Sequence, residues 1–173
     1  MSIVMSLQNK LYKEIIIKKR EIEQIRKNGG NANKERDLPC MAAACEYAGV
    51  EKCGFSSRSK HITRPDVHYP FDQLLQNALV RQAPDVPKLP YVVFSKKRKP
   101  VMTPSGEVKY KRVVEKFVGT CAEDNASNCV LYELSAEQKP GTLKDLTFVH
   151  PIRPRTLKRE RMCGVCRNIF TEP

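Results

Sequence analysis

Three cysteines in two short motifs constrain the fold of this chain more than any other feature. Cys121 opens the sequence Cys-Ala-Glu, and Cys163 and Cys166 lie in the later sequence Cys-Gly-Val-Cys-Arg. Thiolates in such motifs are typical zinc ligands, and three of them fill three of the four positions of a tetrahedral site. The fold must therefore bring two segments that are distant in the sequence to one point.

The acidic residue two positions after Cys121 favours a catalytic zinc site over a structural one. A structural site is closed by four protein ligands, whereas a catalytic site keeps one position for water. Zinc lowers the pKa of that water from about 15.7 to about 7, and Glu123 could carry protons from it to a leaving amine. Both motifs fall at the amino ends of predicted helices, which stabilise thiolates. Arg167 is predicted to offset the thiolate charge by donating to a sulfur.

A closed structural site is the alternative interpretation of these cysteines. Its fourth ligand could be Cys129, His150 or Cys53. Cys129 lies well inside the helix predicted after Cys121, and we expect it to be a buried thiol instead. Cys40, Cys45 and Cys53 could form a second zinc site with His61 or His68, but their spacing matches no common zinc finger, and buried cysteines on a helix are the preferred interpretation.

The charge of the chain favours a polyanionic partner. Among 173 residues, 31 are Lys or Arg and 19 are Asp or Glu, which gives a formal net charge of +12. Each cation placed on a phosphate releases counterions, so nucleic acid is the expected partner. The predicted contacts form two clusters, one at a hairpin tip and one before the cysteine pair: Lys96, Lys97, Arg98 and Lys99, and Arg153, Arg155 and Lys158. The alternative is a solvated basic surface without a ligand.

The sequence also predicts an intracellular location, in the cytoplasm or the nucleus. Its seven cysteines are an odd number, and the first ten residues do not resemble a Sec signal peptide. No run of about eighteen apolar residues occurs, so no membrane partner is expected. Delivery of the protein as an effector remains compatible with this pattern.

Hydrophobic periodicity divides the chain into a mainly helical region, 1–90, and a core, 91–173. The first region comprises a helical arm over 1–27, a linker over 28–37, and helices and a loop over 38–90. Its helices are predicted at Leu38–Tyr47 and Phe71–Gln82. The apolar stripe of the arm consists of Leu7, Leu11, Ile15, Ile22 and Ile25. The arm could dock on the core, bind a protein partner or mediate self-association.

The core is predicted to follow the order β-β-α-β-α. A hairpin is expected from Tyr91–Phe94 and Lys109–Val118, with a turn at Pro104-Ser105-Gly106. A helix over Cys121–Leu134, a strand over Leu143–His150 and a helix over Arg159–Ile169 complete it.

The two cysteine motifs in this context resemble the cytidine deaminase superfamily. Its three-cysteine branch carries a Cys-Ala-Glu helix and a Cys-Gly-x-Cys-Arg helix on a mixed sheet, and the resemblance covers roughly residues 91–170. It implies an α/β fold, a cytidine-deaminase-like α/β/α sandwich preceded by the helical amino-terminal region, with Zn²⁺ as cofactor. The implied reaction is attack of activated water on C4 of cytosine or C6 of adenine, with Glu123 protonating the ring nitrogen and then the departing ammonia.

Departures from the family pattern bear on the substrate. Met162 stands where proline usually precedes the cysteine pair, and Asp124 stands where the small nucleoside enzymes have arginine. The predicted strand also lacks their ribose-binding Asn-x-Glu sequence. Few residues follow Cys166, so either the amino-terminal ninety residues complete the sheet or the sheet is small.

These features predict a toxin-like or effector-like hydrolase that deaminates a base in single-stranded DNA or RNA, cytosine before adenine. The alternatives are a deaminase of free nucleosides or nucleotides, and a nucleic-acid-binding module with structural zinc and no enzymatic activity.

Overall fold

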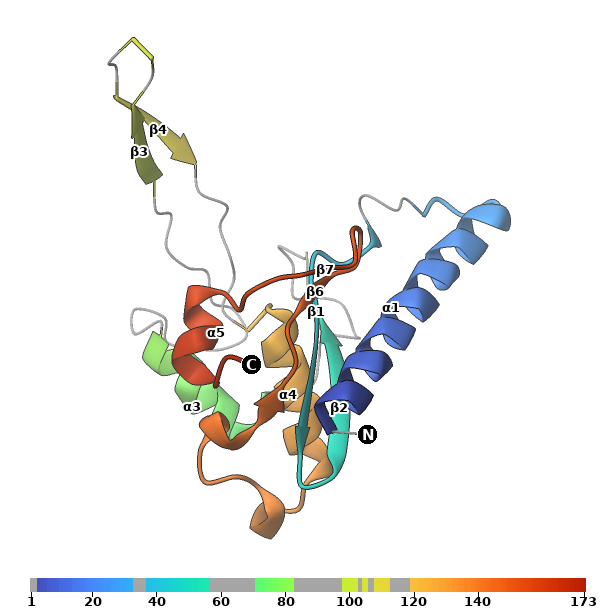
Figure 1. Ribbon diagram of the computed structural model, residues 1–173, viewed down its shortest axis with the longest axis vertical. Coiled ribbons are helices and arrows are strands. Elements are labelled where there is room, and N and C mark those ends of the chain that lie inside the picture. The colour runs from blue at the N-terminus through green and yellow to red at the C-terminus, as the bar shows by residue number, and fades with distance from the viewer. Residues whose placement is uncertain are drawn as a thin grey trace.

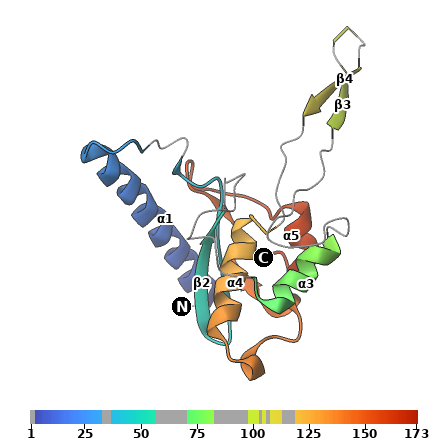
Figure 2. The same ribbon diagram turned by 180° about the vertical axis from the view of Figure 1, so that it is seen from behind.

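The computed structural model describes residues 3–32, 37–56, 71–82, 98–102, 104–105, 108–112 and 119–173. The described helices are α1 (Ile3–Lys27), α3 (Gln73–Gln82), α4 (Ala122–Glu133) and α5 (Gly164–Ile169), with 3-10 helices η2 (Ala136–Gln138) and η3 (Leu143–Asp145). The strands are β1 (Ala42–Tyr47), β2 (Val50–Phe55), β3 (Arg98–Met102), β4 (Val108–Arg112), β5 (Thr147–Phe148), β6 (Ile152–Arg153) and β7 (Lys158–Arg159). In Figures 1 and 2, α1 covers one face of the main sheet and α4 the other.

The main sheet is built around the hairpin of β1 and β2. Its strand order is β2-β1-β6-β7, and β5 also pairs with β1. The hairpin register runs from Ala42 opposite Phe55 to Tyr47 opposite Val50. Every pairing between described strands is antiparallel, so the predicted mixed sheet is not what these strands form. The described chain therefore combines helices with antiparallel sheet.

The predicted helix over Leu38–Tyr47 is wrong, because most of this segment is strand β1. Ala42, Ala43, Ala44 and Cys45 are all fully buried. Ala42 and Ala44 join the core cluster under α1, whereas Cys45 joins the cluster under α4. Small side chains let helices approach both faces of the strand, and this packing overrides the helix propensity of alanine. Strands β1 and β2 come from the region predicted to be helical, and they complete the sheet.

The amino-terminal helix packs on the sheet as an integral layer. Leu7, Leu11, Ile15 and Ile22 of its predicted stripe are buried, but Ile25 is 50% exposed. Lys10 Nζ also lies 3.4 Å from a carboxylate oxygen of Glu51 on β2. Of the three roles that the sequence left open for the arm, docking on the core is therefore the one observed.

The other predicted elements agree with the structure to different degrees. The helices predicted at 71–82 and 121–134 are confirmed as α3 and α4. The strand predicted at 143–150 is confirmed only at β5, because its first residues form η3. The last helix was predicted to begin at Arg159 but begins at Gly164. Lys158 and Arg159 instead form strand β7, which pairs with β6. No helix among the described residues is long and apolar enough to cross a membrane.

The predicted hairpin before α4 is present with shifted strands. Strands β3 and β4 pair from Arg98 opposite Arg112 to Met102 opposite Val108, in a two-stranded sheet separate from the main one. They project from one end of the molecule (Figure 1). Residues 91–97 and 113–118, which were also predicted as parts of this hairpin, lie outside the described residues.

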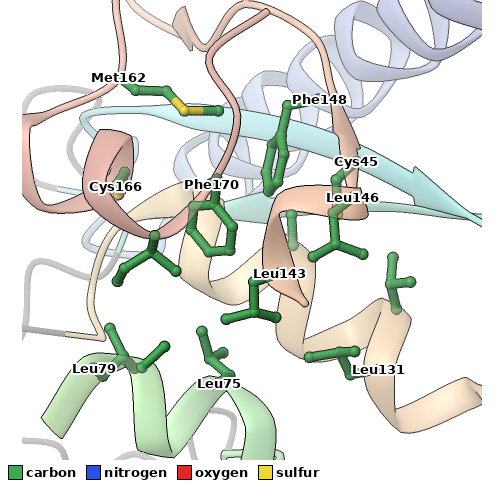
Figure 3. Close-up of a cluster of buried hydrophobic side chains, with 14 of the residues drawn as sticks. Cys45, Leu75, Leu79, Leu131, Leu143, Leu146, Phe148, Met162, Cys166 and Phe170 are labelled. Atoms are coloured by element: carbon green, nitrogen blue, oxygen red, sulfur yellow. The ribbon is translucent and has the colours of Figure 1, made fainter. Parts of the chain in front are cut away.

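The larger hydrophobic core lies between α4, α3 and α5. Figure 3 shows Leu75 and Leu79 of α3 facing Phe170, with Leu131, Leu143 and Cys166 in the same cluster. The rings of Phe148 and Phe170 lie 4.8 Å apart between centroids. This core joins the two helices that carry the cysteine motifs.

A close backbone contact sets the position of α4 on the sheet. A Cβ atom added to Gly54 of β2 would lie 2.3 Å from the backbone nitrogen of Ala126 and 2.4 Å from the carbonyl oxygen of Ala122. The Asn125 side chain donates to the carbonyl oxygen of Phe55 at 2.8 Å. Only glycine allows this approach, so the first turns of α4 are held against the end of β2.

We expect Gly54→Ala to lower the free energy of unfolding by about 3 kcal/mol, because the added methyl group would overlap backbone atoms of α4. Urea unfolding of the purified variant measures this change. Gly141→Ala is the matched control, since an added Cβ there has no heavy atom within 4 Å. Equal stability of the two variants would contradict the close contact.

Candidate metal centre

The three cysteines of the two motifs meet at one point. The Sγ atoms of Cys121, Cys163 and Cys166 all lie within 4.8 Å of one another. The Sγ atoms of Cys121 and Cys163 are 3.6 Å apart. Tetrahedral zinc–sulfur bonds of about 2.3 Å place sulfur atoms about 3.8 Å apart, so this cluster fits one metal ion. The predicted convergence of the two motifs is confirmed, and the three cysteines could bind a metal.

Cys121 is held by the turn that leads into α4. It is the N-cap residue of this helix, and its carbonyl oxygen accepts the backbone N–H of Asn125 at 3.2 Å. The turn contains Gly119 at a φ of +81°, where an added Cβ would lie 2.7 Å from the Phe71 ring. A side chain would oppose both this backbone conformation and the packing, so glycine is required here.

Cys163 and Cys166 are presented by the first turn of α5. Cys163 is the N-cap residue, and its sulfur accepts the backbone N–H of Cys166 at 3.5 Å. Cys166 is fully buried, and Met162 before the motif is 2% exposed within the same core. At the other end of α5, Lys144 Nζ donates to the carbonyl oxygen of Phe170 at 2.8 Å. Met162 thus contributes an apolar side chain to the core.

The protein environment disfavours the thiolate forms of Cys121 and Cys166 in the absence of a cation. Hydrogen bonding to Cys163, together with burial, raises the pKa of Cys121 well above its ordinary value. Hydrogen bonds to Cys121 and Cys163, and then burial, raise the pKa of Cys166. A divalent cation reverses this balance, because it stabilises the deprotonated sulfurs directly.

Two carboxyl groups lie on the first turn of α4, beside Cys121. Glu123 is 5% exposed and Asp124 is fully buried. Burial raises the pKa of Asp124 well above its ordinary value, and the charges of Glu123 and Cys163 raise it further. Glu123, the predicted proton carrier, thus lies on a buried turn beside a second carboxyl group.

Arg167 lies at the exposed surface of α5. Its backbone N–H donates to the carbonyl oxygen of Cys163 at 3.0 Å. Arg161 first, and Arg167 more weakly, lower the pKa of Glu172. Donation from the Arg167 side chain to a thiolate stays a prediction.

The predicted nucleic-acid contacts lie in two places. Arg98 and Lys99 belong to β3, whereas Lys96 and Lys97 fall outside the described residues. Arg153, Arg155 and Lys158 belong to the exposed hairpin of β6 and β7. A guanidinium nitrogen of Arg153 lies 3.0 Å from a carboxylate oxygen of Glu160, and this ion pair offsets part of the charge of Arg153.

The other cysteines are distributed over the molecule. Cys129 is exposed, so the prediction of a buried thiol is wrong: it lies on the outer side of α4, whereas its neighbour Val130 faces the core. Cys45 is buried, Cys53 is half-buried and Cys40 is exposed, and they come from strands or loop, not from the predicted helix. Cys121, Cys163 and Cys166 form the one metal-binding cluster found among the described residues. His61 and His68 lie outside those residues, and His150 is half-buried after β5.

Sequence reasoning missed two residues that build this site. Gly54 positions α4, and Asp124 adds a buried carboxyl group beside Glu123. The sequence signal for Asp124 was its position where the nucleoside enzymes carry arginine. For Gly54 no comparable signal exists, because the contact joins distant segments.

Comparisons with known proteins do not place the chain in a family. Neither protein-family models, nor curated proteins, nor solved structures gave a match.

We expect the purified protein to bind one zinc ion per chain and Cys166→Ser to lose it, because two thiolates bind zinc much more weakly than three. Metal analysis after dialysis measures the stoichiometry. Cys129→Ser is the matched control, since Cys129 is exposed on α4 and outside the cluster. Full zinc content in Cys166→Ser would contradict the proposed ligand set.

We expect Asp124→Asn to raise the free energy of unfolding at neutral pH by on the order of 1 kcal/mol, because the charged carboxylate is costly to bury. A raised pKa in the folded protein means that stability falls as pH rises above the ordinary pKa of aspartate. The gap between variant and wild type should therefore widen from about pH 4 upwards, as urea unfolding can measure. A variant less stable than the wild type at neutral pH would contradict this assignment.

Proposed function

We propose that this protein is a zinc-dependent deaminase that acts on a nucleobase in single-stranded DNA or RNA, with cytosine preferred over adenine. One observation carries the proposal. Three cysteine sulfurs converge within 4.8 Å, and a nearly buried glutamate lies two residues after one of them, on the first turn of the same helix. This arrangement supplies metal ligands and a proton carrier from a single structural unit.

The donor set favours zinc as the metal. Thiolates are soft ligands, and three sulfurs in a tetrahedral arrangement are typical of zinc sites. Cys121, Cys163 and Cys166 would hold the ion. When bound, zinc supplies Lewis-acid activation of a water molecule at neutral pH.

Glu123 would move the protons of the reaction. The residue is 5% exposed, on the turn that begins at Cys121 and next to the buried Asp124. A carboxylate in such a site can take up the two protons of the attacking water in turn, passing the first to the ring nitrogen of the base and the second to the leaving amine. The exclusion of bulk water around the first turn of α4 strengthens both transfers.

The preference for nucleic acid over a free nucleoside is supported by the positive charge of the β6–β7 hairpin, which is exposed. The β6–β7 hairpin carries exposed cations, and the chain runs from it directly into the motif of Cys163. Cations so placed can contact the phosphates on either side of a target base. The toxin-like or effector-like role and the intracellular location remain part of the proposal.

We expect the zinc-loaded protein to convert cytosine to uracil in a single-stranded oligonucleotide, and Glu123→Gln to reduce the rate by at least about a hundredfold because it removes the proton carrier. Mass spectrometry of the digested strand measures uracil. Glu137→Gln is the matched control, since Glu137 is exposed on η2.

Zinc content must be measured in both variants, so that loss of activity is separated from loss of metal. Absence of uracil with the wild type on DNA and RNA, or equal rates with Glu123→Gln, would contradict the proposal. Faster turnover of free cytidine than of the oligonucleotide would instead favour a nucleoside deaminase. Tight strand binding without turnover would favour a structural zinc module.

A further inference from the structure

The turn between β6 and β7 presents an apolar side chain in an unusual backbone conformation. Residues 154–157 connect the two strands, and Leu157 is 40% exposed at a φ of +58°. The backbone N–H groups of Thr156 and Leu157 both donate to the carbonyl oxygen of Arg153, at 3.1 and 2.8 Å. These hydrogen bonds fix the turn and hold Leu157 in its conformation.

Leucine is a costly residue at this position for two reasons. A positive φ brings its Cβ close to the backbone, so glycine or asparagine is the usual choice. Exposure of its side chain to water is also unfavourable. Apart from Leu157, Ala48 in the β1–β2 turn is the one non-glycine residue at positive φ among those described. Residues strained in this way are concentrated at functional sites.

The surroundings of Leu157 are strongly basic. Arg155, Lys158 and Arg159 are exposed on the same short hairpin. Arg155 also lines a cavity of about 300 Å³ together with Lys19, Ile22, Glu23 and Leu38, where α1 lies beside the turn. An exposed apolar side chain among cations matches a polyanion that also offers apolar surfaces, and stacked bases are such surfaces.

We propose that the β6–β7 turn is a nucleic-acid-binding element in which Leu157 inserts between two adjacent bases of a single strand. The inference rests on the proposed function for the choice of ligand. Arg155, Lys158 and Arg159 contact the flanking phosphates, and Leu157 separates two stacked bases.

This role gives the strain at Leu157 a function. The hydrogen-bonded turn prevents the side chain from folding back onto the protein, so the wedge is preformed before the strand binds. A turn that served only to connect β6 and β7 would be better built with glycine at position 157.

The test uses single strands that contain 2-aminopurine, whose fluorescence rises when it is unstacked, with the Glu123→Gln protein so that no turnover occurs. The wild-type turn should raise the fluorescence on binding. Leu157→Gly should abolish the rise and weaken binding by about fivefold to twentyfold, while its thermal midpoint stays equal to or above that of the parent. Leu157→Met should restore most of the fluorescence change.

Ala48→Gly is the matched control, because it relieves positive φ in the other turn without altering this hairpin. It should bind and unstack the strand like the parent protein. Equal binding and fluorescence for Leu157→Gly would overturn the inference. Leucine-dependent binding to anionic lipid vesicles, with no effect on the strand, would also overturn it and indicate a membrane contact.

The readouts are independent of deamination. A fluorescence rise that depends on Leu157, in a protein that produces no uracil in its wild-type form, would support the wedge and refute the proposed reaction. Uracil formation by the wild-type protein, together with equal binding and fluorescence for Leu157→Gly, would support the reaction and refute the wedge.

Discussion

The contact between Gly54 and α4 is the constraint on which the rest of the structure depends. With no side chain at Gly54, the backbone of Ala122 and Ala126 lies directly on β2. Asn125 reinforces the contact through its hydrogen bond to Phe55. Cys121 and Glu123 occupy the same turn of the helix, so the sheet sets the positions of the candidate ligand and of the proposed proton carrier. A wider separation between α4 and β2 would move Cys121 and Glu123 together.

The metal cluster then joins two helices that already share a core. Cys166 belongs at once to the sulfur cluster and to the hydrophobic core that contains Phe170 and Leu79. The protein thus brings the sulfurs together by apolar packing, although hydrogen bonds to Cys121 and Cys163, and then burial, raise the pKa of Cys166. Binding of a cation relieves this conflict, so we expect metal binding and the stability of this region to be coupled.

The parts of the fold that could be predicted from the sequence are those with strong local patterns. The stripe from Leu7 to Ile22 and the turn residues before Cys121 predicted α1 and the start of α4. The segment Ala42–Tyr47 could not be read in this way, because three alanines favour a helix locally and only packing on both faces makes them a strand. The position of Leu143 in a 3-10 helix likewise depends on core contacts that no local pattern records.

The candidate site was more predictable than the fold around it. Metal ligands are limited to a few residue types, and thus Cys121, Cys163 and Cys166 could be identified before their distances were known. Cys129 was predicted to be buried but is exposed, because the sequence does not show which side of α4 faces the sheet. The packing of α4 against Gly54 determines that side. The buried state of Asp124 depends on the same choice.

The central claim is that the three cysteines hold zinc with one position open beside Glu123. X-ray absorption at the zinc edge measures this most directly, on protein with and without a small exogenous thiol. The account predicts three sulfur ligands at about 2.3 Å and one light atom at about 2.0–2.2 Å, with the light atom replaced by a fourth sulfur when the thiol is added. Four sulfur ligands before addition, or a light ligand that the thiol does not replace, would contradict an open catalytic position and indicate a closed structural site.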